Sequence, residues 1–181
     1  MLILYDDAAP YARRGAIHDH AAIAAELLPS GVRLERWNAD IALPRGAGDG
    51  DILAAYGADI ARLKARGGYR SEDVVRLTPG HPQRADMRAK FLAEHVHDED
   101  EVRFFVEGAG LFYIRHGGLV RALLCTAGDL IVLPAGLRHW FDTGARPRFT
   151  AIRLFTTPEG WAARFTEDAI AGHIPLLEDA R

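Results

Sequence analysis

From residue 69 onward the chain alternates short apolar segments with turns rich in glycine and proline. Short strands at regular spacing, separated by such turns, are typical of an antiparallel β-sandwich or jelly-roll barrel. We therefore expect a β-barrel core over residues 69–157. The expected strands lie at residues 73–77, 90–95, 101–107, 111–115, 119–126, 129–133, 139–142 and 149–155.

Residues 1–68 have a mixed α/β pattern, and residues 158–181 suggest a short helix followed by a tail. A length of 181 residues fits one domain, so we expect a single domain over residues 1–181. Asp19 is placed to cap a helix. The elements expected in the N-terminal segment are strands at residues 1–5 and 32–37 and helices at residues 19–28 and 51–67.

Composition narrows the classes of protein to which the chain can belong. A formal net charge of -3 argues against a nucleic-acid-binding surface. The single cysteine cannot form an internal disulfide, and no apolar run is long enough to span a membrane. Residues 1–7 lack the basic and apolar regions of a signal peptide. We expect a cytoplasmic monomer with no nucleic-acid or membrane partner.

Three histidines and one glutamate have the spacing of a metal site. His95 and His97 are two residues apart, which places both imidazoles on one face of a strand. Glu101 follows four residues later, and His139 comes from a distant segment. Imidazole and carboxylate are natural ligands for Fe, Ni, Mn or Zn. We expect the four side chains to converge on one divalent ion.

Such a ligand set leaves room for chemistry. An octahedral ion with four protein ligands keeps two open positions, which suit a substrate that binds through two oxygens. A closed structural zinc site is usually sulfur-rich, whereas Cys125 is the only thiol and lies in an apolar segment, where we expect it to be a core residue. The remaining histidines are expected at the surface: His18, His20, His81, His116 and His173.

The two segments resemble the paired motifs of the cupin superfamily. The first matches HxHxxxE followed by Gly108, and the second, over residues 128–139, matches GxxxxxPxGxxH. Ala89 replaces the leading glycine of the first motif, and Thr143 stands where many cupins have asparagine. Neither difference affects a ligand. The resemblance implies a double-stranded β-helix, the cupin form of the jelly-roll barrel.

The resemblance can be narrowed to one family within the superfamily. Residues 91–112 (FLAEHVHDEDEVRFFVEGAGLF) and 133–142 (LPAGLRHWFD) closely resemble the signature segments of acireductone dioxygenases. Residues 153–155 and 160–161 also fit that family. The resemblance implies an enzyme of methionine salvage with one Fe(2+) or Ni(2+) per chain, held by His95, His97, Glu101 and His139.

The implied substrates are O2 and 1,2-dihydroxy-3-keto-5-methylthiopentene, a small enediol. With Fe the family forms formate and 4-methylthio-2-oxobutanoate. With Ni it forms formate, carbon monoxide and 3-methylthiopropanoate. The ligand set accepts either metal, and also Co or Mn. The availability of each metal in the cell decides which one is bound as much as its affinity does.

Further side chains are expected to complete the site. Arg103 has the same side-chain parity as Glu101 on one strand, so it is the first candidate to stabilise negative charge near the metal. Arg153, on a later strand, is the second. Phe91, Phe141 and Trp161 are expected to wall a pocket for the thioether end of the substrate, although core packing explains each of them nearly as well.

Two alternatives remain open at this stage. One is another metal-dependent cupin enzyme, such as a Mn or Zn isomerase or a different dioxygenase. The other is a non-catalytic cupin that binds a small ligand. A regulatory protein would usually add a nucleic-acid-binding segment, and residues 1–68 contain neither a helix-turn-helix pattern nor a basic stripe.

Overall fold

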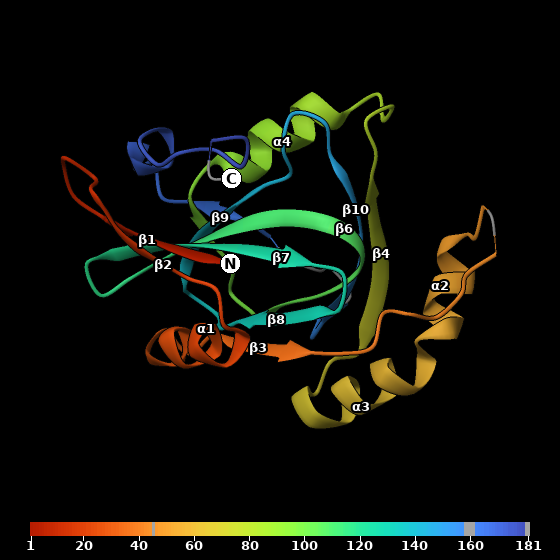
Figure 1. The fold of residues 1–181 in the computed structure, drawn as a ribbon. Helices are drawn as coiled ribbons and strands as arrows, with labels where there is room; N and C mark the ends of the chain where they lie inside the picture. The colour runs from red at the N-terminus through yellow and green to blue at the C-terminus, as the bar shows by residue number, and fades with distance from the viewer. Residues whose placement is uncertain (45, 158–161, 180–181) are drawn as a thin grey trace.

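A computed structural model describes residues 1–44, 46–157 and 162–179 of the chain. Strands contain more of its residues than helices do, and the helices lie around the outside of the strands (Figure 1). The helices are α1 (His20–Leu27), α2 (Asp49–Ala55), α3 (Gly57–Gly67) and α4 (Arg84–Leu92), with 3-10 turns at Leu28–Ser30 and Ala169–Gly172. None of the helices in these residues is long and apolar enough to cross a membrane.

The strands pair antiparallel throughout. They are β1 (Leu2–Asp6), β2 (Arg13–Ile17), β3 (Arg33–Arg36), β4 (Ser71–Leu77), β5 (His95–Val96), β6 (Glu101–His116), β7 (Leu119–Thr126), β8 (Asp129–Leu133), β9 (Arg138–Asp142), β10 (Arg148–Phe155) and β11 (Arg164–Phe165). The mainly β fold of a jelly-roll barrel is therefore confirmed.

The long strand β6 belongs to both walls of the barrel. Its first part lies between β8 and β10, in a wall ordered β3-β8-β6-β10-β4. Its second part lies between β7 and β9, in a wall ordered β11-β5-β9-β6-β7-β1-β2. The pairing with β10 skips Val106, and Gly108 then takes a positive φ of 73°. This bulge bends the strand from one wall into the other, as bulges do at barrel corners.

Aromatic side chains fill the space between the two walls. Phe105, Phe112, Phe141 and Phe149 are buried in one cluster, with ring centroids 4.6 to 6.4 Å apart. Large aromatic side chains bury much apolar area per residue, so this cluster stabilises the packing of the two walls.

The N-terminal segment is mixed α/β, as expected. Asp19 caps α1 by accepting a hydrogen bond from the backbone N–H of Ala22. The single helix expected at residues 51–67 is instead two helices, because the chain leaves helical geometry at Tyr56. This break places the buried ring of Tyr56 against Phe104, with 5.2 Å between the ring centroids. Strand β2 was not expected, since it is a largely exposed edge strand without apolar alternation.

The strand expected at residues 90–95 is wrong. Its first half, residues 90–92, is the end of α4, and the strand begins only at His95, the first residue of β5. Met87 and Phe91, four residues apart, both pack on the core, which is the spacing of a helix face. The strands expected at residues 101–107 and 111–115 are one strand, β6, because the glycines between them form a bulge rather than a turn.

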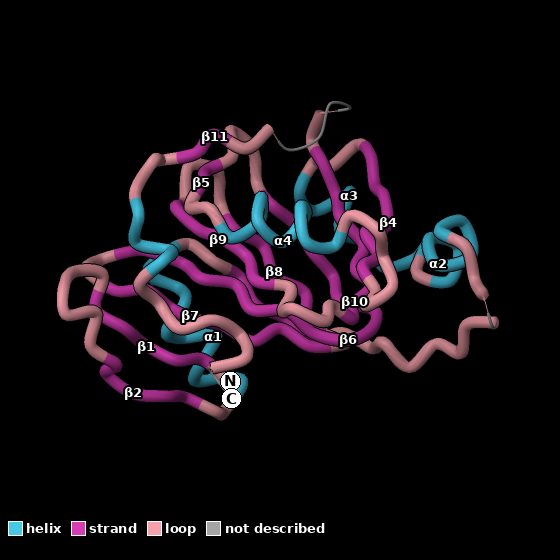
Figure 2. Tube along the Cα trace, turned by 90° about the horizontal axis from the view of Figure 1, so that it is seen from above, coloured by secondary structure: helices cyan, strands magenta, loops and turns pink. Residues whose placement is uncertain are grey.

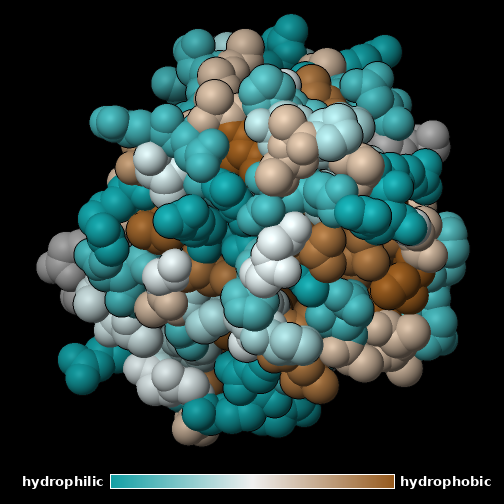
Figure 3. Space-filling view, turned by 90° about the vertical axis from the view of Figure 1, so that its left-hand side faces the viewer, coloured by the Kyte–Doolittle hydropathy of each residue, from teal (hydrophilic) through white to brown (hydrophobic). Residues whose placement is uncertain are grey.

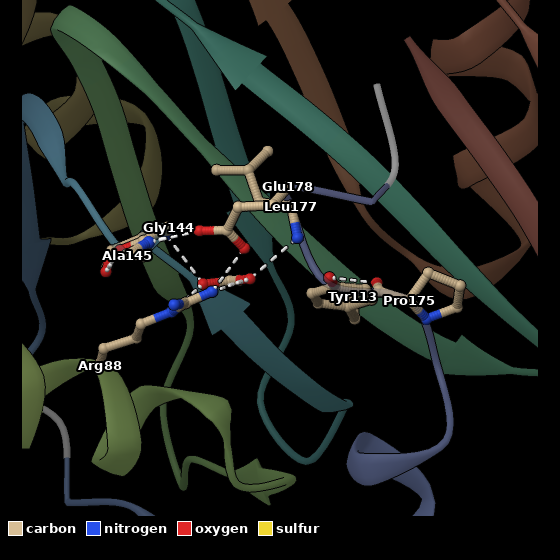
Figure 4. A network of polar contacts seen from close by, with 9 residues as sticks. Arg88, Tyr113, Gly144, Ala145, Pro175, Leu177 and Glu178 are labelled. Atoms are coloured by element: carbon tan, nitrogen blue, oxygen red, sulfur yellow. Dashed lines mark hydrogen bonds and ion pairs between the residues drawn. The ribbon is translucent and has the colours of Figure 1, made fainter.

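Polar contacts attach the C-terminal segment to the barrel (Figure 4). Arg88 of α4 donates hydrogen bonds to both Asp142 and Glu178. The hydroxyl of Tyr113 donates to the carbonyl oxygen of Pro175. The face on the left of Figure 1 is mostly hydrophilic, with small separated hydrophobic areas (Figure 3). The short strand β11, at the start of the described C-terminal segment, pairs with β5 (Figure 2). The predicted ligand His95 lies on β5.

Candidate metal centre

Four side chains from three strands and one loop meet inside the barrel. His95 lies on β5, opposite His139 of β9 in the ladder, while Glu101 begins β6. His97 follows β5 directly. One nitrogen or oxygen atom from each of the four residues lies within 4.8 Å of the others. The structure therefore brings together every residue that the sequence predicts as a ligand.

The carboxylate of Glu101 is at the middle of this group. Its Oε2 atom lies 2.9 Å from Nε2 of His139 and 3.2 Å from Nε2 of His97. The rings of His95 and His139 are 4.5 Å apart, measured between centroids. All four side chains are buried. A close group of buried imidazoles and a carboxylate is costly unless the groups share a proton or a cation.

Backbone carbonyl groups orient all three imidazoles. The Nδ1 atom of each ring lies against a carbonyl oxygen: Ala93 for His95 at 2.7 Å, Leu137 for His139 at 2.8 Å, and Ala162 for His97 at 3.1 Å. Since a carbonyl only accepts, each Nδ1 carries the proton and donates it. The Nε2 lone pairs are then left for a shared ligand, which is the usual arrangement around a metal ion.

Electrostatics favour the protonation states of His95 and Glu101 that a metal needs. Burial and, to a smaller extent, the neighbouring His139 lower the pKa of His95 to about 4, so the imidazole is neutral at pH 7. Burial opposes ionisation of Glu101, but the charge of Arg103 holds its pKa well below the usual range. Neutral imidazoles and an ionised carboxylate are the forms that bind divalent metals.

This donor set fits a divalent first-row metal. Three imidazole nitrogens and one carboxylate oxygen suit Fe, Ni, Co, Mn or Zn, whereas soft-metal sites use thiolates. The only cysteine, Cys125, is buried on β7 and is not part of the group. The fit rests on the convergence of the Nε2 atoms and on the ionised Glu101.

A cavity of about 150 Å³ opens next to the four side chains. The other described residues that line it are Lys90, Phe91, Arg103, Phe141, Arg153 and Ala163. Of the further site residues predicted from the sequence, four are therefore at the cavity: Arg103, Arg153, Phe91 and Phe141. Trp161 lies outside the described residues.

The two arginines are held differently. Arg103 is buried, lies 2.8 Å from Glu101, and stacks over Phe141 with its guanidinium carbon 4.5 Å from the ring centroid. Arg153 is partly exposed and makes two hydrogen bonds to Asp73, at 2.8 and 2.5 Å. Arg103 and Arg153 are paired residues of neighbouring strands, so the two cations lie side by side.

Several contributors were not predicted from the sequence. Strand β11 covers β5, with Phe165 against His95 at 6.0 Å between ring centroids. The carbonyl of Ala162 has no sequence signal, because every residue carries one. Lys90 was assigned to a strand, and the helical spacing of Met87 and Phe91 is the signal that would have placed it on a helix instead.

A larger hollow lies elsewhere. It has a volume of about 430 Å³ and is formed mainly by residues 143–148 with Leu177 and Glu178. It is wide open and, among its described lining residues, contains no histidine or cysteine. Although this hollow is larger, its described lining therefore lacks the metal-binding side chains of the smaller cavity.

Comparison with known proteins agrees with the arrangement. Residues 1–163 match the ARD/ARD' family. A protein from Parvibaculum lavamentivorans, named acireductone dioxygenase, is 55% identical over 177 residues, which are 98% of this chain and 96% of the relative. One from Pseudomonas aeruginosa with the same name is 55% identical over 157 residues, 87% of each chain.

A solved structure is also similar. It is an acireductone dioxygenase from Bacillus anthracis with a cadmium ion in its active center, 31% identical, with a TM-score of 0.79. The match covers 91% of this chain and 98% of that one. Family match, sequence identity and fold agree over nearly the whole length. The chain belongs to the ARD/ARD' family.

Proposed function

We propose that this protein is an acireductone dioxygenase of methionine salvage. It adds O2 to 1,2-dihydroxy-3-keto-5-methylthiopentene. The products are formate and 4-methylthio-2-oxobutanoate when Fe(2+) is bound, or formate, carbon monoxide and 3-methylthiopropanoate when Ni(2+) is bound. The observation that carries the proposal is the buried group of three imidazoles and one carboxylate beside Arg103. The names of the relatives support the same reaction.

His95, His97, Glu101 and His139 would hold one divalent metal per chain. Bound there, the metal would supply a Lewis acid that stabilises an enediolate. The protein fixes the imidazole orientation through the carbonyls of Ala93, Leu137 and Ala162.

Arg103 is the residue that we assign to charge stabilisation. Its guanidinium reaches the cavity from a buried position, where the surroundings screen its charge weakly. Negative charge on the substrate oxygens is therefore stabilised more strongly than it would be in water. Arg153 is the second cation at the cavity, held in place by Asp73.

Phe91 and Phe141 give the cavity an apolar wall. Their rings lie 6.3 Å apart, edge to face, and Phe141 is buried. An apolar wall suits the thioether end of the substrate and limits the entry of water to the reacting oxygens. We assign the same role to Trp161 from the sequence alone.

Metal binding is tested first, on untagged protein. We expect about one divalent transition metal per chain, and we expect His139→Ala to lose metal and activity together. His116→Ala is the matched control, because His116 is an exposed histidine at the end of β6. A preparation without metal that binds none on titration would show that the proposal is wrong.

The reaction is tested by anaerobic reconstitution with Fe(2+) or Ni(2+). We expect O2 consumption when the acireductone is added, with carbon monoxide formed only in the Ni(2+) sample. A metal-loaded protein that consumes no O2 would instead point to an isomerase or a binding protein.

We also propose that the chain is a monomeric, single-domain enzyme of the cytoplasm. Ile23 and Leu27 of α1 belong to the same buried core cluster as the aromatic side chains of the barrel, which supports one domain. The oligomeric state is tested by light scattering with size-exclusion chromatography, where a mass near 19.9 kDa is expected.

A further inference from the structure

We propose that Lys90 is the residue that captures the anionic substrate at the mouth of the metal-centre cavity. This inference rests on the proposed function, because it assigns a substrate-recognition residue to the same site. It concerns a residue that the ligand motifs do not contain.

Lys90 lies where the cavity meets solvent. It belongs to the last turn of α4, it is exposed, and it lines the cavity that also contains Arg103 and Arg153. Among the described lining residues, Glu101 is the only acid. The wall of the cavity therefore carries three cations and one carboxylate before any metal is counted, and an anion is attracted to it.

The other two cations are already engaged with carboxylates. Arg103 lies against Glu101, and Arg153 is held by both oxygens of Asp73. Among the residues that the structure describes, Lys90 forms no ion pair with a carboxylate, not even with Asp86 one turn earlier on α4, whereas both arginines form one. Its charge is consequently the least neutralised of the three.

The acidic run at residues 98–100, which follows His97, is engaged elsewhere. Asp98 accepts hydrogen bonds from Arg164, Glu99 accepts one from the backbone N–H of Thr156, and Asp100 accepts one from Ala135. None of the three acids is among the described lining residues of the cavity. The acidic run at residues 98–100 is thus used to fix loops.

The chemistry of lysine suits capture rather than precise positioning. Its ammonium group is a compact charge on a flexible stem and can meet an anion over a range of positions, while a guanidinium held in an ion pair cannot. A charge at the mouth of a cleft raises the rate at which a charged substrate arrives. An enediolate anion would first meet Lys90 and then pass to the buried Arg103.

Lys90 also has a structural role that the test must separate. As a cation in the last turn of α4, it interacts favourably with the helix dipole. That role affects stability, but it does not make the association of an anion depend on salt. The salt dependence of kcat/KM is therefore the readout that distinguishes capture from helix stabilisation.

The kinetic experiment compares Lys90→Met, Lys90→Glu and Lys90→Arg in the metal-loaded enzyme. Lys64→Met is the matched control, because Lys64 is the only other lysine and pairs with Glu72 away from the cavity. We expect kcat/KM to fall roughly tenfold in Lys90→Met, and further in Lys90→Glu, through a higher KM at unchanged kcat. Lys90→Arg and Lys64→Met should stay within about twofold of the wild type.

A second experiment needs no turnover. Acetic anhydride is used to modify the two lysines of the metal-loaded protein, with and without oxalate, a dianion that binds through two oxygens. Ionic strength is held constant with NaCl. We expect oxalate to slow the acetylation of Lys90 at least about threefold and to leave Lys64 unchanged, as measured by peptide mass spectrometry.

The outcomes separate the two claims. If the wild-type protein does not convert the acireductone but oxalate protects Lys90, the proposed function fails and anion capture stands. If Lys90→Met keeps the kcat/KM and the salt dependence of the wild type, the inference about Lys90 is overturned and the proposed function stands. Acetylation of Lys90 that is the same with and without oxalate also overturns the inference.

Discussion

The guanidinium of Arg103 lies 2.8 Å from the carboxylate of Glu101, and both side chains are buried. The two residues are two positions apart on β6, so their side chains lie on the same face of the strand. Glu101 at the same time contacts His97 and His139. A positive charge is thus fixed directly behind the carboxylate that completes the proposed ligand set.

Arg103→Ala is expected to keep the metal and to slow turnover by about 10²–10³-fold, since the variant loses a donor that stabilises charge in the reaction. Arg103→Lys should recover part of the rate, because it keeps the charge without the fork of donors. Metal content and initial rates of O2 consumption are the measurements. Wild-type rates in both variants would show that Arg103 has no role in the reaction.

The control concerns folding. Removal of Arg103 leaves Glu101 buried beside imidazoles alone, and an unpaired buried charge costs about 3–5 kcal/mol. Thermal unfolding of both variants is therefore measured alongside activity, and Arg103→Lys provides the test if Arg103→Ala does not fold.

Much of the barrel and of the metal centre can be predicted from local sequence pattern. The bounds expected for β7 and β8 agree with the structure, because each is a mainly apolar run bounded by turn residues: Gly118 before β7, Gly128 between the two strands, and Pro134 after β8. The convergence of His95 and His97 follows from their spacing. Their meeting with His139 could be expected from the residue types that a metal needs and from the resemblance to a family, but not from spacing, which carries no information on distant strand pairing.

The remaining features depend on tertiary contacts. Residues 90–95 contain aromatic and apolar side chains that fit a strand as well as a helix, and packing of Phe91 on Phe141 decides for the helix. The role of the Ala162 carbonyl depends on how the C-terminal segment returns to β5. Asp73 finds Arg153 across a strand pair separated by 80 residues. Local pattern contains none of these relationships.

Cys125 is expected to be unreactive in the folded protein. Its side chain is fully buried on β7, and burial raises the pKa of the thiol well above its usual value. Because the thiolate is the reactive form, DTNB should modify the native chain at least about a hundredfold more slowly than the unfolded chain.

The control for this experiment is Ala58→Cys, which adds a thiol at an exposed position of α3. That variant should react once, rapidly, without denaturant, and a second time in urea. Rapid modification of the wild-type protein without denaturant would contradict the burial of Cys125.

Gly108 is expected to tolerate no side chain. Its φ of 73° is unfavourable for other residues, and an added Cβ would lie 1.8 Å from the backbone carbonyl oxygen of Arg148 on β10. Gly118→Ala is the matched control, because Gly118 has a φ of 81° but nothing within 4 Å of the added carbon. The control should lose about 1–2 kcal/mol of stability from strain alone.

Gly108→Ala should lose at least about 2 kcal/mol more than the control, because the backbone of β10 must move away from the bulge. Urea unfolding measures the free energy of unfolding of both variants. If Gly108→Ala does not fold, the yields of folded protein of the two variants are compared instead. Equal losses in the two variants would show that the close approach of β6 and β10 is not required.

Asp142 should make stability depend on pH in acid. Arg88 donates two hydrogen bonds to its buried carboxylate, and the backbone N–H groups of Gly144 and Leu177 donate two more (Figure 4). Burial alone would raise the pKa of Asp142, but these donors lower it below the usual 3.8. At the same acidic pH, Asp142 therefore binds fewer protons on average in the folded state than in the unfolded state.

The sign of the effect follows from linkage. With a folded-state pKa below the unfolded value of 3.8, the contribution of Asp142 is complete above that value and is lost as the pH falls through the folded-state pKa. Asp142→Asn should therefore be less stable than the wild type at pH 7, by about 3 kcal/mol, since Arg88 loses its buried partner. The difference between the two proteins should shrink on acidification.

Urea unfolding, followed by tryptophan fluorescence from about pH 7 to about pH 3, measures this difference. Asp179→Asn is the control, because Asp179 is an exposed acid in the same C-terminal segment, and its curve should run parallel to that of the wild type. If Asp142→Asn keeps a constant offset from the wild type down to the lowest pH, protonation of Asp142 is not linked to folding. The Arg88 network would then stabilise the protein through hydrogen bonds that do not depend on the charge of the carboxylate.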